Sequence, residues 1–369
     1  MKKKFFGIMT ALLFGMACAL SGCAYIQGNG RVHGERYANA DRYEIGDFSY
    51  RADTIDKIEV DWVLGEIELI ESEKETLSVT ESGKDLEEAQ KLRHIIEGRT
   101  LKIKFWKSGY TAQIEASRKH VAIELPAGIS LSADFTSARL SASTLNVREM
   151  DVSCTSGDVQ IGTLTTQEAD FNATSGSLSI ETIQVRGKIS TNFTSGSADI
   201  GTLTAYEAEF DASSGSVEIE TAKLEGNLEA DSTSGSIEIR TLTAYEAEFD
   251  TSSGSVTIQS ASVQRELSHS STSGSTRIDT LSAPLAEFSK SSGGVELGLS
   301  ACKQLKISGT SASVEITLLE DLGATISHSS TSGKLTIKKK HSTQNKQHVI
   351  GNGACRISVQ LSSGNLVVE

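Results

Sequence analysis

Three pairs of carboxylates are the clearest candidates for chemistry in this sequence. The pairs recur at equivalent points of a repeat that runs through the chain. If the repeats stack as strands at about 4.8 Å, six like charges share one face, which is unfavourable unless cations offset them. Hard oxygen ligands suit Ca²⁺. The pattern predicts either a weak, Ca²⁺-dependent contact surface or, as the simpler alternative, a solvated acidic face. The residues are Glu209, Asp211, Glu229, Asp231, Glu248 and Asp250.

Other reactive side chains point to structure more than to catalysis. The chain has no nucleophile elbow, P-loop, dinucleotide fingerprint or zinc-ligand spacing, and a serine that recurs in every repeat is typical of a structural column. His269 and His328 both begin the sequence His-Ser-Ser-Thr-Ser-Gly, but three repeats separate them, too far to share a metal. We expect both histidines to pack in the core against Phe249 and Phe288 or to hydrogen-bond to the serine column. The acidic clusters lack a matching set of basic partners, so a polysaccharide-acting β-helix enzyme is kept only as an alternative.

The N-terminus has the parts of an export signal. Lys2, Lys3 and Lys4 precede an apolar stretch that is too short for a comfortable membrane span. The residues that follow it, Leu20-Ser21-Gly22-Cys23, resemble the lipobox of bacterial lipoproteins. That resemblance implies a diacylglyceryl group on Cys23 and cleavage just before it. We predict a signal peptide over residues 1–22, a lipid-anchored spacer over 23–50, and a location on the extracytoplasmic face of the cell membrane. A plain secretory signal or a short buried helix is the alternative.

Composition limits the partners. The formal net charge is −13, which argues against nucleic acid as a partner, since basic patches hold phosphates. Beyond Cys18 and Cys23 the cysteines are Cys154, Cys302 and Cys355, an odd number at wide spacing that defines no disulfide framework. A bridge between Cys302 and Cys355 is left open.

An internal repeat dominates the chain. The motif Thr/Ser-Ser-Gly-x-apolar-x-apolar recurs at a nearly constant interval, and the decapeptide at Thr202 to Asp211 returns unchanged at Thr241 to Asp250. Such regularity predicts an all-β, single-stranded parallel β-solenoid (β-helix) with coils of about 19–20 residues, for which we favour the right hand. The repeat glycines are Gly157, Gly176, Gly196, Gly215, Gly235, Gly254, Gly274, Gly293 and Gly333, and Ala138 and Ala312 fill two further slots.

Residues within one coil alternate with the period of a strand. Phe171, Phe210, Phe249 and Phe288 are predicted to point inward, and the serine before each glycine is predicted to form a file beside them. Each glycine is expected to make a corner at positive φ, which a residue without Cβ adopts at little cost.

The ends of the repeat region are less regular. We interpret residues 51–135 as an irregular β beginning of the solenoid, in which Trp62 to Leu69 resembles one coil and residues 85–96 are expected to form a short surface helix. Residues 136–337 carry the regular repeats. Residues 338–369 are predicted to form a basic loop followed by a last coil, Ile357 to Val368.

The chain resembles a bacterial family labelled "putative adhesin", a domain of unknown function found in surface proteins and lipoproteins. The segment Val121-Ala-Ile-Glu-Leu-Pro126-Ala-Gly128 carries the resemblance, together with units such as Ser156-Gly-Asp-Val-Gln-Ile161. The resemblance implies a β-solenoid at the cell surface and supplies no catalytic residues. The sequence thus predicts a non-enzymatic cell-envelope lipoprotein for surface binding, adhesion or sensing. We expect no resident cofactor beyond weak Ca²⁺, a membrane contact through the lipid, and a protein or polysaccharide partner.

Overall fold

The computed structural model describes residues 25–26, 31–113 and 119–369. The predicted signal peptide and the lipidation site at Cys23 lie outside these residues. The chain forms two compact units, one that runs to Arg186 and includes Ser190–Ser197, and one that comprises Gly187–Ile189 and Ala198–Glu369. Within the described ranges, no helix has the length and apolar character needed to cross a membrane.

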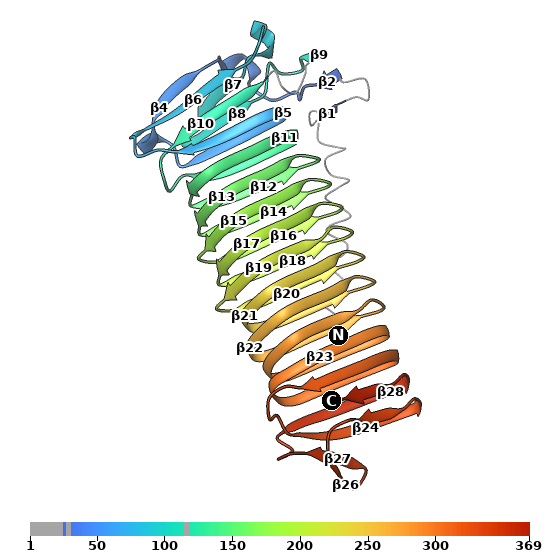
Figure 1. The fold of residues 1–369 in the computed structure, drawn as a ribbon. Helices are drawn as coiled ribbons and strands as arrows, with labels where there is room; N and C mark the ends of the chain where they lie inside the picture. Colours follow the sequence, from blue (N-terminus) through green and yellow to red (C-terminus); the bar gives the residue numbers. More distant parts are fainter. Residues whose placement is uncertain (1–24, 27–30, 114–118) are drawn as a thin grey trace. The chain divides into compact units, whose positions relative to one another are not determined.

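The first unit is built from parallel strands that return at a fixed interval (Figure 1). Strand β11 follows β5 along its length, so that Leu131 lies opposite Ile58, Ala138 opposite Gly65 and Leu140 beside Ile67. Trp62 to Leu69 therefore forms a coil, as predicted, and Gly65 turns its corner at φ +97°. Inward residues of both strands are buried and outward ones are exposed or half-buried. The strands of this stack are β5 (Lys57–Glu71), β11 (Ser130–Asn146), β12 (Glu149–Cys154), β13 (Asp158–Thr166), β14 (Glu168–Ala173) and β15 (Ser177–Val185); β16 (Lys188–Phe193) contributes residues to both units.

A cap of mixed parallel and antiparallel strands covers the free edge of β5. Strand β8 pairs with the first half of β5 and β10 with the second half, both in parallel. Antiparallel strands then extend each side, β7 on β8 and β6 on β10. Because an open edge strand can recruit other chains, this cap protects the beginning of the stack. The cap strands are β3 (Glu44–Ile45), β4 (Phe48–Arg51), β6 (Thr76–Ser82), β7 (Arg93–Glu97), β8 (Thr100–Lys104) and β10 (His120–Leu125).

Two predictions for this region are wrong. Residues 31–50, expected to be spacer, fold onto the cap: β2 (Arg31–His33) pairs with β9 (Thr111–Gln113), β3 with β7, and β4 with β6. β2 also pairs with β1 (Tyr25–Ile26), and short 3-10 turns occur at η1 (Ala40–Arg42) and η2 (Ala52–Thr54).

The helix expected over residues 85–96 is also absent. That segment holds one 3-10 turn, η3 (Glu88–Gln90), and enters β7. Pairing of β7 with β8 overrides the helix-like spacing of its apolar residues.

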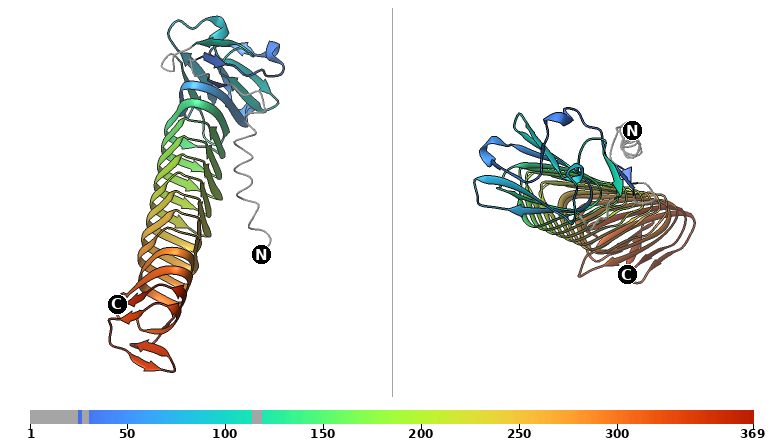
Figure 2. Two further views of the ribbon diagram at one scale, coloured as in Figure 1. Left: turned by 90° about the vertical axis from the view of Figure 1, so that its right-hand side faces the viewer. Right: turned by 90° about the horizontal axis from the view of Figure 1, so that it is seen from above.

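The second unit repeats the parallel pairing. Ala198 lies opposite Val217, which lies opposite Ile237, so successive partners are one repeat interval apart along the chain. Equivalent strands of successive coils lie one upon another, β19 on β17 and β20 on β18 (Figures 1 and 2). Its strands are β17 (Ser197–Ala205), β18 (Glu207–Ala212), β19 (Val217–Leu224), β20 (Asn227–Ser232), β21 (Ser236–Thr251), β22 (Ser255–Ser271), β23 (Thr276–Leu318), β24 (Ala324–Ser332), β25 (Leu335–Ile337), β26 (Ser342–Gln344), β27 (Gln347–Ile350), β28 (Cys355–Ser363) and β29 (Leu366–Val368).

The repeat glycines stand at the corners, but for a different reason from the one expected. Of the predicted set, Gly274 and Gly293 are the corners with positive φ. Elsewhere the constraint is space: a Cβ on Gly254 would overlap the carbonyl oxygen of Gly235 one coil earlier. The glycine, and not the serine before it, faces inward, since Gly176 is buried and Ser175 is exposed. The predicted serine file in the core is therefore wrong.

The C-terminal coils are stacked out of sequence order. Strand β28 lies between β23 and β24, with Leu305 and Ile326 on either side of Ile357. Likewise Leu366 of β29 lies between Val314 and Leu335. The coil that was predicted to be last, Ile357 to Val368, therefore lies between β23 and the coil formed by residues 324–337. The basic segment after that coil forms a β26–β27 hairpin, whose second strand pairs antiparallel with β24.

Candidate functional site

The six carboxylates singled out in the sequence do stand in register on unit 2. Glu209 of β18 lies opposite Glu229 of β20, which lies opposite Glu248 of β21. Asp211, Asp231 and Asp250 form the second column in the same strands. Alanine, leucine and phenylalanine residues alternate with them and are buried, so the carboxylates point outward. We call these two columns the carboxylate ladder.

The ladder is electrostatically strained at its centre. Partial burial raises the pKa of Asp231 to about 7, and the charges of Asp211, Asp250, Glu229 and Glu248 add to the rise. Burial and the neighbouring glutamates raise the pKa of Asp211 to about 6, and the pKa of Glu229 is raised for the same reasons. One Oδ of Asp231 is buried without a hydrogen-bond partner. The central coil of the ladder therefore carries ionised carboxylates at a cost that a nearby positive charge would relieve.

One basic residue partly offsets the negative charge in the first coil of the ladder. Lys188 forms an ion pair with Glu209. Burial is the largest single influence on Lys188 and lowers its pKa, but Glu209 and the neighbouring glutamates together outweigh burial, so the pKa is raised.

The ladder does not form the metal site that the sequence suggested. Across the described ranges, no group of three or more histidine, cysteine, aspartate or glutamate side chains is placed to hold a metal ion. Parallel pairing spreads the carboxylates at one per strand in each column, whereas a Ca²⁺ ion needs six to eight oxygens around one point. We therefore describe the ladder as an extended acidic surface.

Two exposed tyrosines, which were not predicted from the sequence, lie in one column that precedes the ladder along the chain. Tyr206 and Tyr245 are 52% and 43% exposed, unusual values for large side chains in this chain. Between them lies Gly226, whose N–H donates to the carbonyl of Tyr206 at 2.8 Å, while the N–H of Tyr245 donates to Gly226 at 2.9 Å. The three residues thus occupy one column on successive coils. The available signal was the repeated decapeptide, which contains a tyrosine at the same place in both copies.

The tyrosines lie shortly before the carboxylates along the chain. Tyr206 directly precedes β18 and Tyr245 lies in β21, three residues before Glu209 and Glu248 respectively. Because Gly226 has no side chain, the ring of Tyr206 can lie close to it, with Cε1 3.5 Å from where a Cβ would stand. We call this combined surface the tyrosine–carboxylate face.

Two polar residues in the core of unit 2 are structural. His269 is buried edge-on between Phe249 and Phe288, as predicted, and its ring nitrogens contact the hydroxyls of Thr251 at 3.1 Å and Thr276 at 2.8 Å. Burial, and then the charge of Lys290, lowers the pKa of His269 to about 3, so the ring is neutral.

Lys290 is the charged neighbour inside this core. Its Nζ donates to the carbonyls of Gly274 and Gly294 and to the Thr276 hydroxyl, at 3.0, 3.2 and 2.7 Å. Burial lowers its pKa to about 8. An ammonium that uses all three donors inside the core is placed for stability, because it is out of reach of a substrate.

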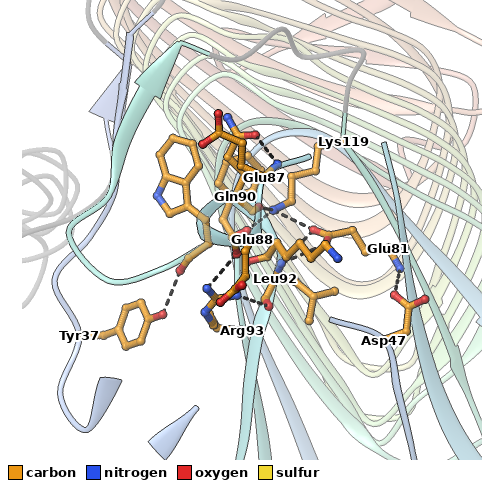
Figure 3. Close-up of polar contacts among 12 residues, drawn as sticks. Tyr37, Asp47, Glu81, Glu87, Glu88, Gln90, Leu92, Arg93 and Lys119 are labelled. Carbon is orange, nitrogen blue, oxygen red and sulfur yellow. Dashed lines mark hydrogen bonds and ion pairs between the residues drawn. The ribbon is translucent and has the colours of Figure 1, made fainter. Parts of the chain in front are cut away.

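A buried ion pair organises the cap of unit 1 (Figure 3). Nζ of Lys119 lies 2.8 Å from Oε1 of Glu81, and both side chains are almost wholly buried. Lys119 also donates to the carbonyls of Gln90 and Phe105. The carboxylate of Glu81 accepts from the N–H of Leu92 at 3.0 and 3.1 Å.

Aromatic rings complete this cluster. Nζ of Lys119 lies 4.1 Å from the ring centroid of Phe105 and 4.9 Å from that of Trp62. Burial lowers the pKa of Lys119 to about 8, against the opposing effect of Glu81. Arg93, whose guanidinium donates to the carbonyls of Glu88, Lys91 and Leu92, is buried nearby. The cluster joins β6 to the residues just before β10 and just after β8, so we interpret it as a contact that holds the cap together.

Comparison with known proteins identifies the family. The profile of a family described as Toastrack DUF4097 matches residues 55–270 and 239–369. No curated protein matches the chain.

Several solved structures are similar to parts of the chain. A "putative adhesin" from Bacteroides fragilis is 19% identical, with 64% of this chain and 96% of that one covered and a TM-score of 0.39. A "putative lipid binding protein" from Parabacteroides distasonis is 18% identical, with coverages of 73% and 95% and a TM-score of 0.34. A "putative adhesin" from Parabacteroides merdae is 13% identical, with coverages of 88% and 97% and a TM-score of 0.28.

Proposed function

The chain belongs to the Toastrack DUF4097 family, and we propose that it is a non-enzymatic, lipid-anchored envelope protein that binds a positively charged partner through the tyrosine–carboxylate face. The anchor is the lipid on Cys23, as the motif Leu20-Ser21-Gly22-Cys23 implies. The body is a right-handed parallel β-solenoid, whose coils present this face outside the cytoplasm.

The register of the tyrosine–carboxylate face carries this proposal. An isolated exposed tyrosine or glutamate needs no explanation, but here two tyrosines and six carboxylates stand in aligned columns on the same coils. A tyrosine ring attracts a cation that lies over its face, by about 0.5–1 kcal/mol at an exposed site. Burial first, and then four neighbouring carboxylates, raise the pKa of Asp231, so its ionised form is disfavoured where it stands. A partner that brings positive groups to this face satisfies both features.

The net charge of the protein supports the same partner class. At −13, the chain attracts cationic surfaces at a distance and repels anionic ones. Binding through such a face should therefore weaken as salt is added, because surface charges are screened over about 8 Å at physiological ionic strength.

A binding experiment with isolated envelopes tests the proposal. The body, residues 24–369, is incubated with envelopes over a salt series, beside the double variant Tyr206→Ala/Tyr245→Ala. Loss of two exposed cation–π contacts should weaken binding roughly 5- to 30-fold. The matched control is Tyr206→Phe/Tyr245→Phe, which keeps both rings and should bind like the wild type. Equal binding by the alanine variant, or binding that rises with salt, contradicts the proposal. Protease treatment of the envelopes distinguishes a protein partner, whose binding is lost, from an amine-bearing polymer, whose binding persists.

A further inference from the structure

The C-terminal coil sits between two coils that precede it in the sequence. Strand β28 pairs with β23 on one side and with β24 on the other, and β29 pairs with β23 and β25. A chain that stacked its coils in sequence order would instead place β24 directly on β23. Something must favour the inserted order over the sequential one.

The pairing of either coil with β23 offers little preference between these orders. The inserted coil carries Ser363-Gly364-Asn-Leu366-Val-Val368 and its neighbour carries Ser332-Gly333-Lys-Leu335-Thr-Ile337. The two segments lie in register with each other and present the same alternation of apolar and polar residues. Either coil could therefore pair with the corresponding residues of β23.

Two cysteines do distinguish the orders. Cys355 begins β28, and the next residue, Arg356, lies opposite Gln304 of β23, two residues after Cys302. Both cysteines are free thiols here; Cys355 is buried and Cys302 is half-buried. Their side chains are hydrogen-bonded to each other. We propose that Cys302 and Cys355 form a disulfide that fixes the C-terminal coil in its inserted position.

Geometry makes this bridge specific for the inserted order. In the sequential order β24 would separate β28 from β23, which places the two backbones at about 9–10 Å, twice the spacing of neighbouring strands. A disulfide requires Cα atoms within about 7 Å. The bridge can therefore close only when β28 lies next to β23, and once closed it excludes the alternative.

The contact also sets the order of the chemical steps. The hydrogen bond from Cys355 lowers the pKa of Cys302, so the half-exposed thiol is the one that becomes a thiolate. Its sulfur attacks a low-molecular-weight disulfide such as oxidised glutathione, forms a mixed disulfide and releases one glutathione thiolate. The thiol of Cys355 then loses its proton and attacks the sulfur of Cys302, which releases the second glutathione. Two protein thiols are oxidised and one small disulfide is reduced to two thiols.

The test uses the full chain, purified in detergent under reducing conditions. It is incubated with a mixture of reduced and oxidised glutathione, quenched with an alkylating agent after unfolding, and mapped by peptide mass spectrometry. The expected result is one linked peptide pair that contains Cys302 and Cys355, with Cys154 alkylated. Oxidation should also raise the urea midpoint of the wild type and leave that of Cys302→Ser unchanged.

Three results would overturn the proposal. These are recovery of Cys302 and Cys355 as alkylated thiols, a bridge that involves Cys154, or a bridge between Cys355 of two separate chains. None of these outcomes depends on whether the tyrosine–carboxylate face binds a partner, so the two proposals fail independently.

Discussion

Replacing Asp231 by asparagine should stabilise the protein at alkaline pH and change little in acid. Asp231 sits at the centre of the carboxylate ladder, between Asp211 and Asp250, where burial and like charges raise its pKa from 3.8 to about 7. Because the folded protein holds this proton more tightly than the unfolded chain, folding is favoured while Asp231 is protonated. The penalty develops as pH rises from about 4 and is complete above about 7.

The size of the effect follows from that pKa. A rise from 3.8 to about 7 corresponds to roughly 4 kcal/mol for a group sealed from water. Asp231 is only partly buried, so solvent screening reduces the expected gain for Asp231→Asn to about 1–2 kcal/mol at pH 8. Below pH 4 the wild-type carboxyl is protonated in both states, and the two proteins should differ by less than about 0.5 kcal/mol.

Urea unfolding followed by far-ultraviolet circular dichroism at pH 4, 6 and 8 is the appropriate assay. Both tryptophans, Trp62 and Trp106, lie in unit 1, so their fluorescence would not report on the ladder. The matched control is Glu238→Gln, which removes the same charge from an exposed position of β21 and should show no such pH dependence. If Asp231→Asn gains no more at pH 8 than Glu238→Gln, or loses stability there, repulsion within the ladder is not the cause.

Three further changes test other parts of the structure. Glu81→Gln leaves the buried ammonium of Lys119 without its carboxylate and should lower the free energy of unfolding by about 3–5 kcal/mol, measured by tryptophan fluorescence. The double variant Glu81→Gln/Lys119→Met should lose less than the sum of the two single variants. Additive losses would refute a coupled pair. Gly254→Ala places a Cβ on the backbone of the previous coil and should lower the melting temperature, whereas Gly294→Ala, with open space around it, should not; equal effects would contradict the packing argument. Cys23→Ser should move the protein from the membrane fraction to the soluble fraction after cell lysis, and unchanged membrane association would rule out lipid as the anchor.

The regular part of the fold could be predicted because it depends on local signals that repeat. A constant interval with period-2 alternation aligns Glu209, Glu229 and Glu248 on one face without any knowledge of the rest of the chain. The same pattern located the corner glycines, but it could not show whether Gly254 is needed for its backbone angle or for the space between coils. That distinction depends on how closely two coils approach.

What the sequence did not show depends on contacts distant along the chain. Strands β4, β6 and β7 of the cap pair antiparallel with partners that no repeat relates to them. The inserted order of β28 could not be inferred because Gly333 and Gly364 begin near-identical motifs, either of which fits the same neighbour. Lys290 occupies an inward position that the three preceding coils fill with Ser232, Thr251 and Ser271. Only the structure shows the three oxygens that accept hydrogen bonds from its ammonium.

In-cell photo-cross-linking tests the central claim most directly, because it uses the lipidated full chain in its own envelope. A photoreactive phenylalanine analogue replaces Tyr206 or Tyr245 in turn, and replaces Glu238 as the control at an exposed position outside the tyrosine–carboxylate face. The account predicts a discrete cross-linked partner from positions 206 and 245, reduced by added salt, and none from position 238. No cross-link at either tyrosine, or the same products from all three positions, would contradict it.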